Sequence, residues 1–213
     1  AGLVNSEGFL GFAVLTTNVT GHAAIFAESI ATNAWNSSWV IALWMFLFLG
    51  GAFTSSFIID SIGKNQRYSN LIPLTFEFLI VVTIAIIGSH YTTNTAMRQL
   101  FAGALLFAMG MQNALVSMIS KSVVRTTHLT GTFTDLGIEL AQLKFIKPEK
   151  KTELKSRIGL KVFIITSFIT GALLGAYAFR KFSYYSFFIP ASILVYTLLY
   201  DILRVNAKIY LRK

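Results

Sequence analysis

Two short segments rich in threonine and glycine are the part of this sequence best suited to bind a ligand. Residues 16–21 read TTNVTG and residues 126–131 read TTHLTG, and we call them the first and second Thr-Gly motifs. β-Branched threonine and glycine both disfavour continuous helix, and threonine hydroxyls can satisfy backbone groups that a break leaves unpaired. Inside a membrane, such a break is tolerated only where it is buried or lines a water-filled cavity. The motifs therefore predict two helix breaks that line a pathway.

A short helix is expected after each motif, over residues 23–32 and 133–146, with Thr20 or Thr130 as its N-cap. The free N–H groups at such a helix start favour an anion or a carboxylate. The alternative is that the small residues only let helices approach closely, which is what we expect of Gly171 and Gly175. The predicted substrate site comprises Asn5, Thr16, Thr17, Thr20, Gly21, Asn113, Thr126, Thr127, Thr130, Gly131 and Asp135.

Glu77 is the best single candidate for a proton or cation site, because it lies well inside an apolar segment. A charge at the centre of a membrane helix costs about 2.5–3.5 kcal/mol on insertion scales and so needs a reason. The alternative is a neutral glutamic acid hydrogen-bonded to a neighbouring helix. The three histidines have no metal-ligand spacing and the chain has no cysteine, so we expect neither a metal site nor a cofactor.

The composition is that of a membrane protein. Apolar residues make up 54% of the 213 residues and charged residues only 13%, whereas a soluble chain carries about 25% charged residues. With so few charges much of the surface must face lipid. The net charge of +9 could indicate a nucleic-acid partner, but the basic residues lie between apolar runs and lack interleaved aromatics. The lipid bilayer is therefore the expected environment, and no nucleic acid is expected.

Five apolar runs are long enough to cross a bilayer, which needs about 20 residues of helix. A sixth, shorter run opens the chain, and we interpret it as the remainder of another membrane helix. The loops 34–38 and 90–97 carry no Lys or Arg. Three other connections are basic: Lys64 with Arg67, the loop 144–157, and the C-terminal end. The positive-inside rule then places both termini in the cytoplasm. Arg180 and Lys181 fall on the opposite side. The expected spans cover residues 1–15, 39–59, 71–89, 100–120, 158–179 and 184–203.

Several matches with nearly one displacement indicate an internal repeat. The Thr-Gly motifs are 110 residues apart, residues 2–6 resemble 110–114, Gly51-Ala52 matches Gly171-Ala172, and Ile72-Pro73 matches Ile189-Pro190. We therefore expect a single membrane domain (1–213) of two three-helix repeats, 1–92 and 98–213, with the basic cytoplasmic loop 144–157 in the second. Because each copy crosses the membrane an odd number of times, the copies must be inverted. The alternative is that the duplication only builds a stable bundle.

The second motif and the residues before it resemble the signature of the YoaK-like family of bacterial integral membrane proteins of unknown function. The resemblance rests on Gly110-Met-Gln-Asn113-Ala114 followed by residues 125–137, RTTHLTGTFTDLG, and on Asn18-Val-Thr-Gly21 in the first half. It implies an inner-membrane protein with about six helices and no assigned activity. Two positions depart from the family pattern: Asn5 replaces an expected Asp, and His22 replaces an Asn. His22 could titrate in place of the missing acid.

The expected fold is an all-α membrane protein of about six transmembrane helices in two inverted repeats, with short broken or interfacial helices after the Thr-Gly motifs. No phosphate-binding loop, zinc-protease motif or serine-nucleophile motif is present in the sequence, so we do not expect an enzyme. The leading hypothesis is a multi-pass inner-membrane transporter or channel-like permease for a small molecule or ion. The competing hypothesis is a structural or accessory subunit that uses phenylalanine-rich faces to bind membrane-protein partners or a second copy of itself.

Overall fold

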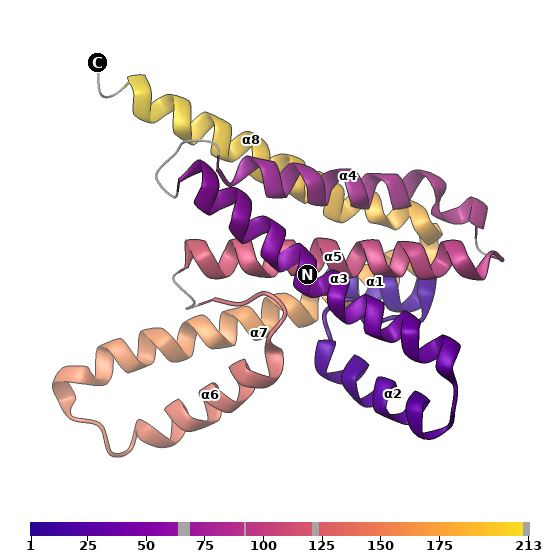
Figure 1. Ribbon diagram of the computed structural model, residues 1–213. Coiled ribbons are helices and arrows are strands. Elements are labelled where there is room, and N and C mark those ends of the chain that lie inside the picture. The colour runs from indigo at the N-terminus through magenta and orange to yellow at the C-terminus, as the bar shows by residue number, and fades with distance from the viewer. Residues whose placement is uncertain (64–68, 92, 121–123, 211–213) are drawn as a thin grey trace.

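The computed structural model describes residues 1–63, 69–91, 93–120 and 124–210, and within these ranges the regular structure is helical, as expected (Figure 1). Side chains are described up to residue 203. The basic residues Lys64, Arg67, Arg212 and Lys213 lie outside the described ranges. The elements are α1 (Gly2–Phe12), α2 (Val19–Ala31), α3 (Trp35–Ile62), α4 (Leu71–Ile87), the 3-10 helix η1 (Gly88–Tyr91), α5 (Thr95–Ile119), α6 (Leu129–Gln142), α7 (Pro148–Phe182), the 3-10 helix η2 (Ser183–Phe187) and α8 (Phe188–Tyr210).

Within the described ranges, four helical segments are long and apolar enough to cross a membrane: Trp35–Ile62, Leu71–Tyr91, Thr95–Ile119 and Pro148–Leu203. The last of these contains both α7 and α8, with η2 between them. Only 22% of the most apolar stretch of the first segment and 17% of that of the last is buried within the protein. Their apolar side chains therefore face outward, where lipid or another membrane helix covers them favourably. The protein is a multi-pass membrane protein.

Helix α5 is the central helix of the bundle. More than half of its apolar stretch is buried, and it packs against α3, α4 and α1. Leu105, Leu106 and Met109 of α5 are fully buried in the main hydrophobic core. In Figure 1, α4 and α8 run along one side of α5, α3 crosses α5, and α2 and the α6–α7 hairpin lie on the other side.

Two pairs of helices cross at backbone-to-backbone distance because glycine occupies the contact. Where α5 crosses α3, a Cβ atom on Gly110 would overlap the carbonyl oxygen of Phe48 and lie 3.2 Å from the amide nitrogen of Ala52. Where α1 crosses α7, a Cβ atom on Gly2 would overlap the carbonyl oxygen of Phe168. Small residues allow such close approach between membrane helices, which gains van der Waals contact where no hydrophobic driving force is available.

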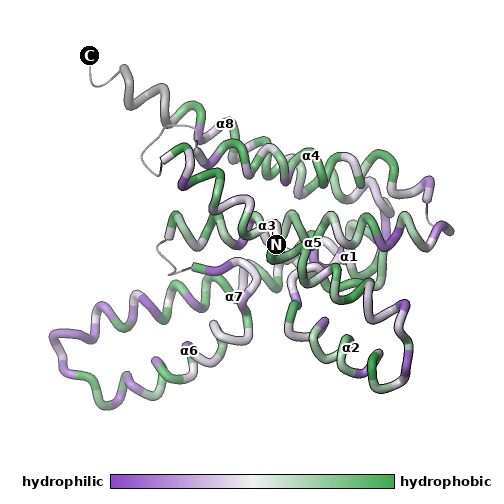
Figure 2. Tube along the Cα trace, viewed as in Figure 1, coloured by the Kyte–Doolittle hydropathy of each residue, from purple (hydrophilic) through white to green (hydrophobic). Residues whose placement is uncertain are grey.

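The hydrophilic residues gather at the ends of the two hairpins (Figure 2). The segment 144–157, expected as a basic loop, is helical from Pro148 onward, so its lysines lie on the first turns of α7. Proline at the first helical position explains this start, because its missing N–H has no helical partner there in any case. At 35 residues α7 is much longer than the roughly 20 residues that span a bilayer, and its basic beginning extends past the apolar part.

We predict that Gly110→Ala destabilises the protein by about 1–3 kcal/mol, the usual cost of forcing extra atoms into a packed contact. The added methyl group would separate α5 from α3. The matched control is Gly137→Ala in α6, where nothing lies within 4 Å of the new Cβ atom and alanine should be neutral or slightly stabilising. Thermal unfolding in detergent, followed by circular dichroism, measures the difference. Equal unfolding temperatures for Gly110→Ala and the control would contradict the prediction.

Candidate functional site

The first Thr-Gly motif coincides with a helix break, as predicted. Helix α1 ends at Phe12, and Ala13 adopts a left-handed backbone conformation (φ 59°) whose N–H still bonds to the Phe9 carbonyl. Helix α2 begins at Val19, and the side chain of Asn18 accepts a hydrogen bond from the Gly21 N–H at 2.9 Å. The expected N-cap Thr20 was therefore wrong: Asn18 caps α2, and the helix starts four residues earlier than expected.

Asn5 fastens this break to α1. Its side-chain oxygen accepts hydrogen bonds from the backbone N–H of Thr17 at 3.1 Å and from the Thr17 hydroxyl at 2.9 Å. Thr17 is buried, so both bonds are shielded from water. An amide oxygen satisfies both donors without carrying a charge, which gives Asn5 a structural role at the break.

His22 projects from the first turns of α2 towards the break. Its ring nitrogen Nε2 lies 3.0 Å from the Leu15 carbonyl oxygen, and its ring centroid lies 5.9 Å from that of Trp44 on α3. Burial lowers the pKa of His22, although the Leu15 carbonyl opposes part of this shift. A neutral ring with its proton on Nε2 donates to the Leu15 carbonyl, so His22 holds the break at neutral pH.

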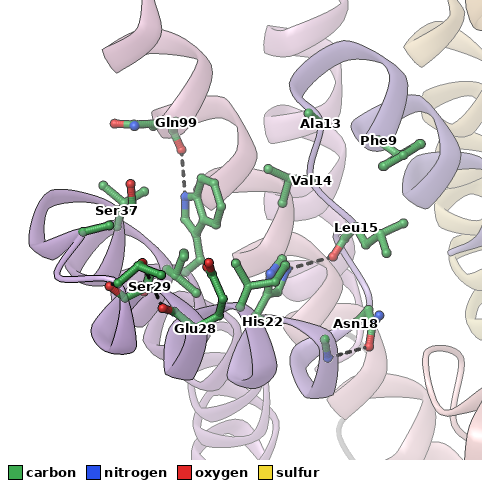
Figure 3. Close-up of a pocket in the computed structure, with 17 residues that line it drawn as sticks. Phe9, Ala13, Val14, Leu15, Asn18, His22, Glu28, Ser29, Ser37 and Gln99 are labelled. Atoms are coloured by element: carbon green, nitrogen blue, oxygen red, sulfur yellow. Dashed lines mark hydrogen bonds between the residues drawn. The ribbon is translucent and has the colours of Figure 1, made fainter.

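A cavity of about 700 Å³ lies next to this break, between α1, α2, α3 and the start of α5 (Figure 3). Its size is in the usual range for a small-molecule site. Its wall is mainly apolar, and in Figure 3 the side chains of His22 and Glu28 project from α2 towards it. The polar side chains that line it are those of Asn18, His22, Glu28, Ser29, Thr32, Ser37 and Gln99.

Several buried polar atoms near the two breaks have no hydrogen-bond partner in the described part of the chain. In the first half these are the hydroxyl of Thr16 and both carboxyl oxygens of Glu7. In the second half they are the side-chain oxygen of Asn113 and the hydroxyl of Thr126. A buried polar group left unpaired costs about 1–3 kcal/mol, so each of these atoms calls for water or a ligand.

The second Thr-Gly motif also precedes a short helix, but its local bonds differ. Helix α6 begins at Leu129, and the ring of His128 lies against Gly131, where any Cβ atom would collide with it. The His128 side chain makes no cap hydrogen bond. The expected N-cap Thr130 was therefore wrong as well; its side chain is exposed in the first turn of α6.

Glu139 is the acid of α6 that forms ion pairs with α7. Asp135, chosen from the sequence, is exposed, whereas Glu139 is buried. One carboxyl oxygen of Glu139 accepts from Lys161 Nζ at 2.7 Å and from Arg157 Nε at 2.9 Å, both on α7. Burial alone would raise the pKa of Glu139, but the hydrogen bonds from Lys161 and Arg157 outweigh it and the pKa is lowered. This ionised carboxylate ties α6 to α7.

The structure brings part of the predicted site together. Asn5 and Thr17 are bonded to each other, and Asn18 and Gly21 line the cavity with His22. No residue of the second motif is among those that line this cavity, and a shared interior for the two motifs stays a prediction. Glu77 is 1% exposed on α4, inside the bundle. Among the described residues, no group of three or more histidines or acids could hold a metal ion.

Sequence reasoning overlooked two buried groups. Glu7 is 0% exposed on α1, and Ser186 is 1% exposed on η2. Glu7 carries the same signal that identified Glu77, an acid within an apolar run, but its run is shorter. Nothing in the sequence marked Ser186, because it becomes buried only where η2 interrupts the α7–α8 segment.

Comparison with known proteins agrees with the membrane architecture. The model of a protein family described as "Protein of unknown function (DUF1275)" matches residues 1–200. The UPF0700 transmembrane protein YoaK of Bacillus subtilis (strain 168) is 24% identical over 197 residues, which are 89% of this chain and 84% of that protein. No solved structure shows significant similarity.

We predict that Thr17→Val destabilises the protein by about 0.5–1.5 kcal/mol, because it removes the hydroxyl that bonds to Asn5 in a buried place. Thr20→Val is the matched control: it makes the same change three residues away, on an exposed side chain. Thermal unfolding of both variants in the same detergent measures the difference. If Thr20→Val lowers the unfolding temperature as much as Thr17→Val does, the bond to Asn5 does not stabilise the break.

Proposed function

Because the chain belongs to the DUF1275 family of proteins of unknown function, we propose its function from the geometry of the site. We propose that it is a bacterial inner-membrane transporter or channel-like permease for a small molecule or ion. In this proposal six transmembrane helices form two inverted repeats, and the pathway lies at the interface of the repeats. Sites between inverted repeats, at broken helices, are typical of secondary transporters.

The close helix crossings support the proposed duplication. The α5–α3 crossing joins Gly110 to Phe48 and Ala52, and the α1–α7 crossing joins Gly2 to Phe168 and Ala172. Gly2 and Gly110 are 108 residues apart, whereas Phe48 and Phe168, like Ala52 and Ala172, are 120 apart. The displacements match those of the sequence repeat. In each crossing a glycine of one half meets a helix of the other half, which is the arrangement expected for a pseudo-twofold axis between the repeats.

The two hairpins support it further. Helix α2 packs on α3 and helix α6 packs on α7. In the first pair the Ser29 hydroxyl lies 2.8 Å from that of Ser38. In the second pair Glu139, which is 110 residues after Ser29, bonds to Lys161 and Arg157. Equivalent positions therefore join equivalent helices, with neutral groups in one half and charged groups in the other.

That chemical difference is consistent with inversion and with cytoplasmic termini. A polar hairpin on the cytoplasmic side is expected to carry lysine and arginine, and one on the opposite side is not. Arg180 and Lys181, which fall on the wrong side of this topology, occupy the last turn of α7. There a cation interacts favourably with the negative end of the helix dipole, which offers a local reason for the exception.

The single observation that carries the permease proposal is the set of unpartnered buried oxygens at the breaks. Thr16 and Thr126 occupy the same position of the two Thr-Gly motifs, and both hydroxyls are buried without a partner. Asn113, the counterpart of Asn5, has an unpartnered oxygen as well. A scaffold would be more stable with these atoms paired or replaced by apolar groups. A permease needs them free, to bind water or the substrate as it passes.

The proposed site residues divide between two roles. Asn5, Thr17 and Gly21 shape the first break, and Thr127, Thr130, Gly131 and Asp135 surround the second. The hydroxyls of Thr16 and Thr126 and the amide of Asn113 would contact the substrate. Glu77 is the candidate coupling acid in α4, and its counterpart in the repeat is Leu194, so its role would be asymmetric.

Single cysteines test the inverted topology, because the chain contains no cysteine of its own. Asn36 and Ser156 are 120 residues apart, near the starts of α3 and α7, and both are exposed. We predict that a membrane-impermeant maleimide labels Asn36→Cys in intact cells but labels Ser156→Cys only after permeabilisation. Labelling of both residues from the same side would contradict the inversion.

Flux into proteoliposomes tests the permease function. We predict that osmotic swelling in sodium, potassium, chloride or glycerol solutions exceeds that of protein-free vesicles for at least one of these solutes. Glu77→Gln should slow that swelling because glutamine cannot release a proton, and Thr126→Val should slow it roughly two- to tenfold, the effect of losing one hydrogen bond of about 0.5–1.5 kcal/mol. Thr75→Val, on the exposed face of α4, is the control. Swelling unchanged in both site variants would remove these two residues from the site.

The same preparation addresses the competing role as an accessory subunit. A protein that conducts none of the solutes, and that copurifies from native membranes with other membrane proteins, would favour that role. The exposed aromatic residues of α3 would then cover partner helices rather than lipid. They are Trp35, Trp39, Phe46, Phe53 and Phe57.

A further inference from the structure

We infer that Glu7 and Ser186 form a proton-binding site next to the first helix break, and that its proton drives transport. This inference rests on the proposed function for the coupling, but not for the proton site itself. It deepens the proposal by assigning the coupling ion and by placing it on a residue that the sequence repeat and the composition did not single out.

The first observation is the surroundings of the Glu7 carboxyl group. The side chain is 0% exposed, and neither of its oxygens has a hydrogen-bond partner in the described part of the chain. The Ser186 hydroxyl faces the carboxyl but makes no hydrogen bond of standard geometry with it, and it too is buried without a partner. An isolated carboxylate in such surroundings is far less stable than a neutral acid, so Glu7 holds a proton in this state.

The second observation is that packing does not require an acid there. The position equivalent to Glu7 in the second repeat, 108 residues later, is Leu115, and the position equivalent to Glu77 is Leu194. Both leucines are buried in the hydrophobic core. Leucine therefore fills the equivalent volume in the other half of the bundle. The presence of acids at these two places in only one half indicates a function that requires a carboxyl group.

In the described part of the chain, no cation around Glu7 would hold its carboxyl group permanently ionised. From η2 the facing groups are Ser186 and Tyr184, whose hydroxyl is already committed to the Gly11 carbonyl at 3.0 Å. On α4 the buried titratable group is Glu77, which is 1% exposed. The glycines of α1 that follow Glu7 pack against apolar groups: Gly8 lies near Leu105 of α5, and Gly11 lies near Phe179 of α7. No described lysine or arginine pairs with Glu7.

The turn of α1 that carries Glu7 packs against the helix break. The methyl group of Thr16 lies so close to Gly8, the next residue after Glu7, that a Cβ atom on Gly8 would be 2.6 Å from it. On the other side, η2 is itself an interruption between α7 and α8 and packs against both α1 and α4. When the Glu7 proton leaves, the carboxylate must gain water or a cation, and either would displace Thr16 or η2. Proton release and opening of the break are thereby coupled.

Infrared titration tests the proton site without any transport assay. In the full protein in detergent, we expect a protonated-carboxyl carbonyl band at neutral pH that Glu7→Gln lacks and that converts to the carboxylate band as the pH rises. Glu149→Gln, which changes an exposed glutamate of α7, should keep this band. Glu77→Gln should keep the part of the band that comes from Glu7 and lose only the part that comes from Glu77. Glu7→Leu, which copies the equivalent Leu115, provides a folded variant if glutamine is not tolerated.

Two results would overturn the proton site. Identical carbonyl spectra for wild type and Glu7→Gln at every pH would mean that Glu7 is ionised throughout. A Glu7 band that never converts up to alkaline unfolding would mean that the acid is permanently neutral and structural.

Proteoliposomes with an imposed pH gradient then test the coupling. Glu7→Gln should conduct the responsive solute down its own gradient but lose the acceleration that the pH gradient gives the wild type. Acceleration that survives in Glu7→Gln would overturn the coupling. If the wild type conducts none of the solutes, the permease proposal fails, while the infrared result still decides whether Glu7 binds an exchangeable proton.

Discussion

The absence of water inside the bilayer is the constraint on which this architecture depends. A helix can be interrupted there only if other groups take over the hydrogen bonds that the interruption leaves open. In the first half Asn18, Asn5 and His22 do so: one caps α2, one holds Thr17, and one reaches the Leu15 carbonyl. The break is stabilised by specific side-chain hydrogen bonds, and these bonds distinguish it from an ordinary connecting loop.

The close crossings at glycine supply the rigid frame around the breaks. Because Gly110 and Gly2 allow backbone contact, α5 with α3 and α1 with α7 behave as two fixed pairs. The hairpin helices α2 and α6 attach to the outer member of each pair and carry few core residues of their own. Movement of α2 or α6 would therefore cost less than movement of the glycine-locked pairs.

Much of the fold could be predicted from the sequence, because apolar runs longer than a bilayer have few alternatives to helix. The runs that became α3, α4 and α5 were located to within a few residues. The starts of α2 and α6 were each missed by four residues, since threonine and glycine cost little in a first turn, where the backbone N–H groups lack helical partners. The helical beginning of α7 was also missed. Six crossings and their inversion remain predictions.

The site was predictable only in part, because partners distant in sequence decide what a polar residue does. The Asn5–Thr17 bond joins α1 to the break that follows it, and the Glu139–Lys161 pair joins α6 to α7; no local sequence pattern indicates either of them. Likewise, Asp135 and Glu139 lie one turn apart on the same side of α6, yet only Glu139 is buried, against Arg157 and Lys161 of α7. The same logic explains Ser186, which is polar in a lipid-facing segment by sequence but meets Glu7 once η2 turns it inward. A buried polar group without a hydrogen-bond partner can be recognised only once the packing of neighbouring helices is known. This property distinguishes a candidate functional residue from one with only a structural role.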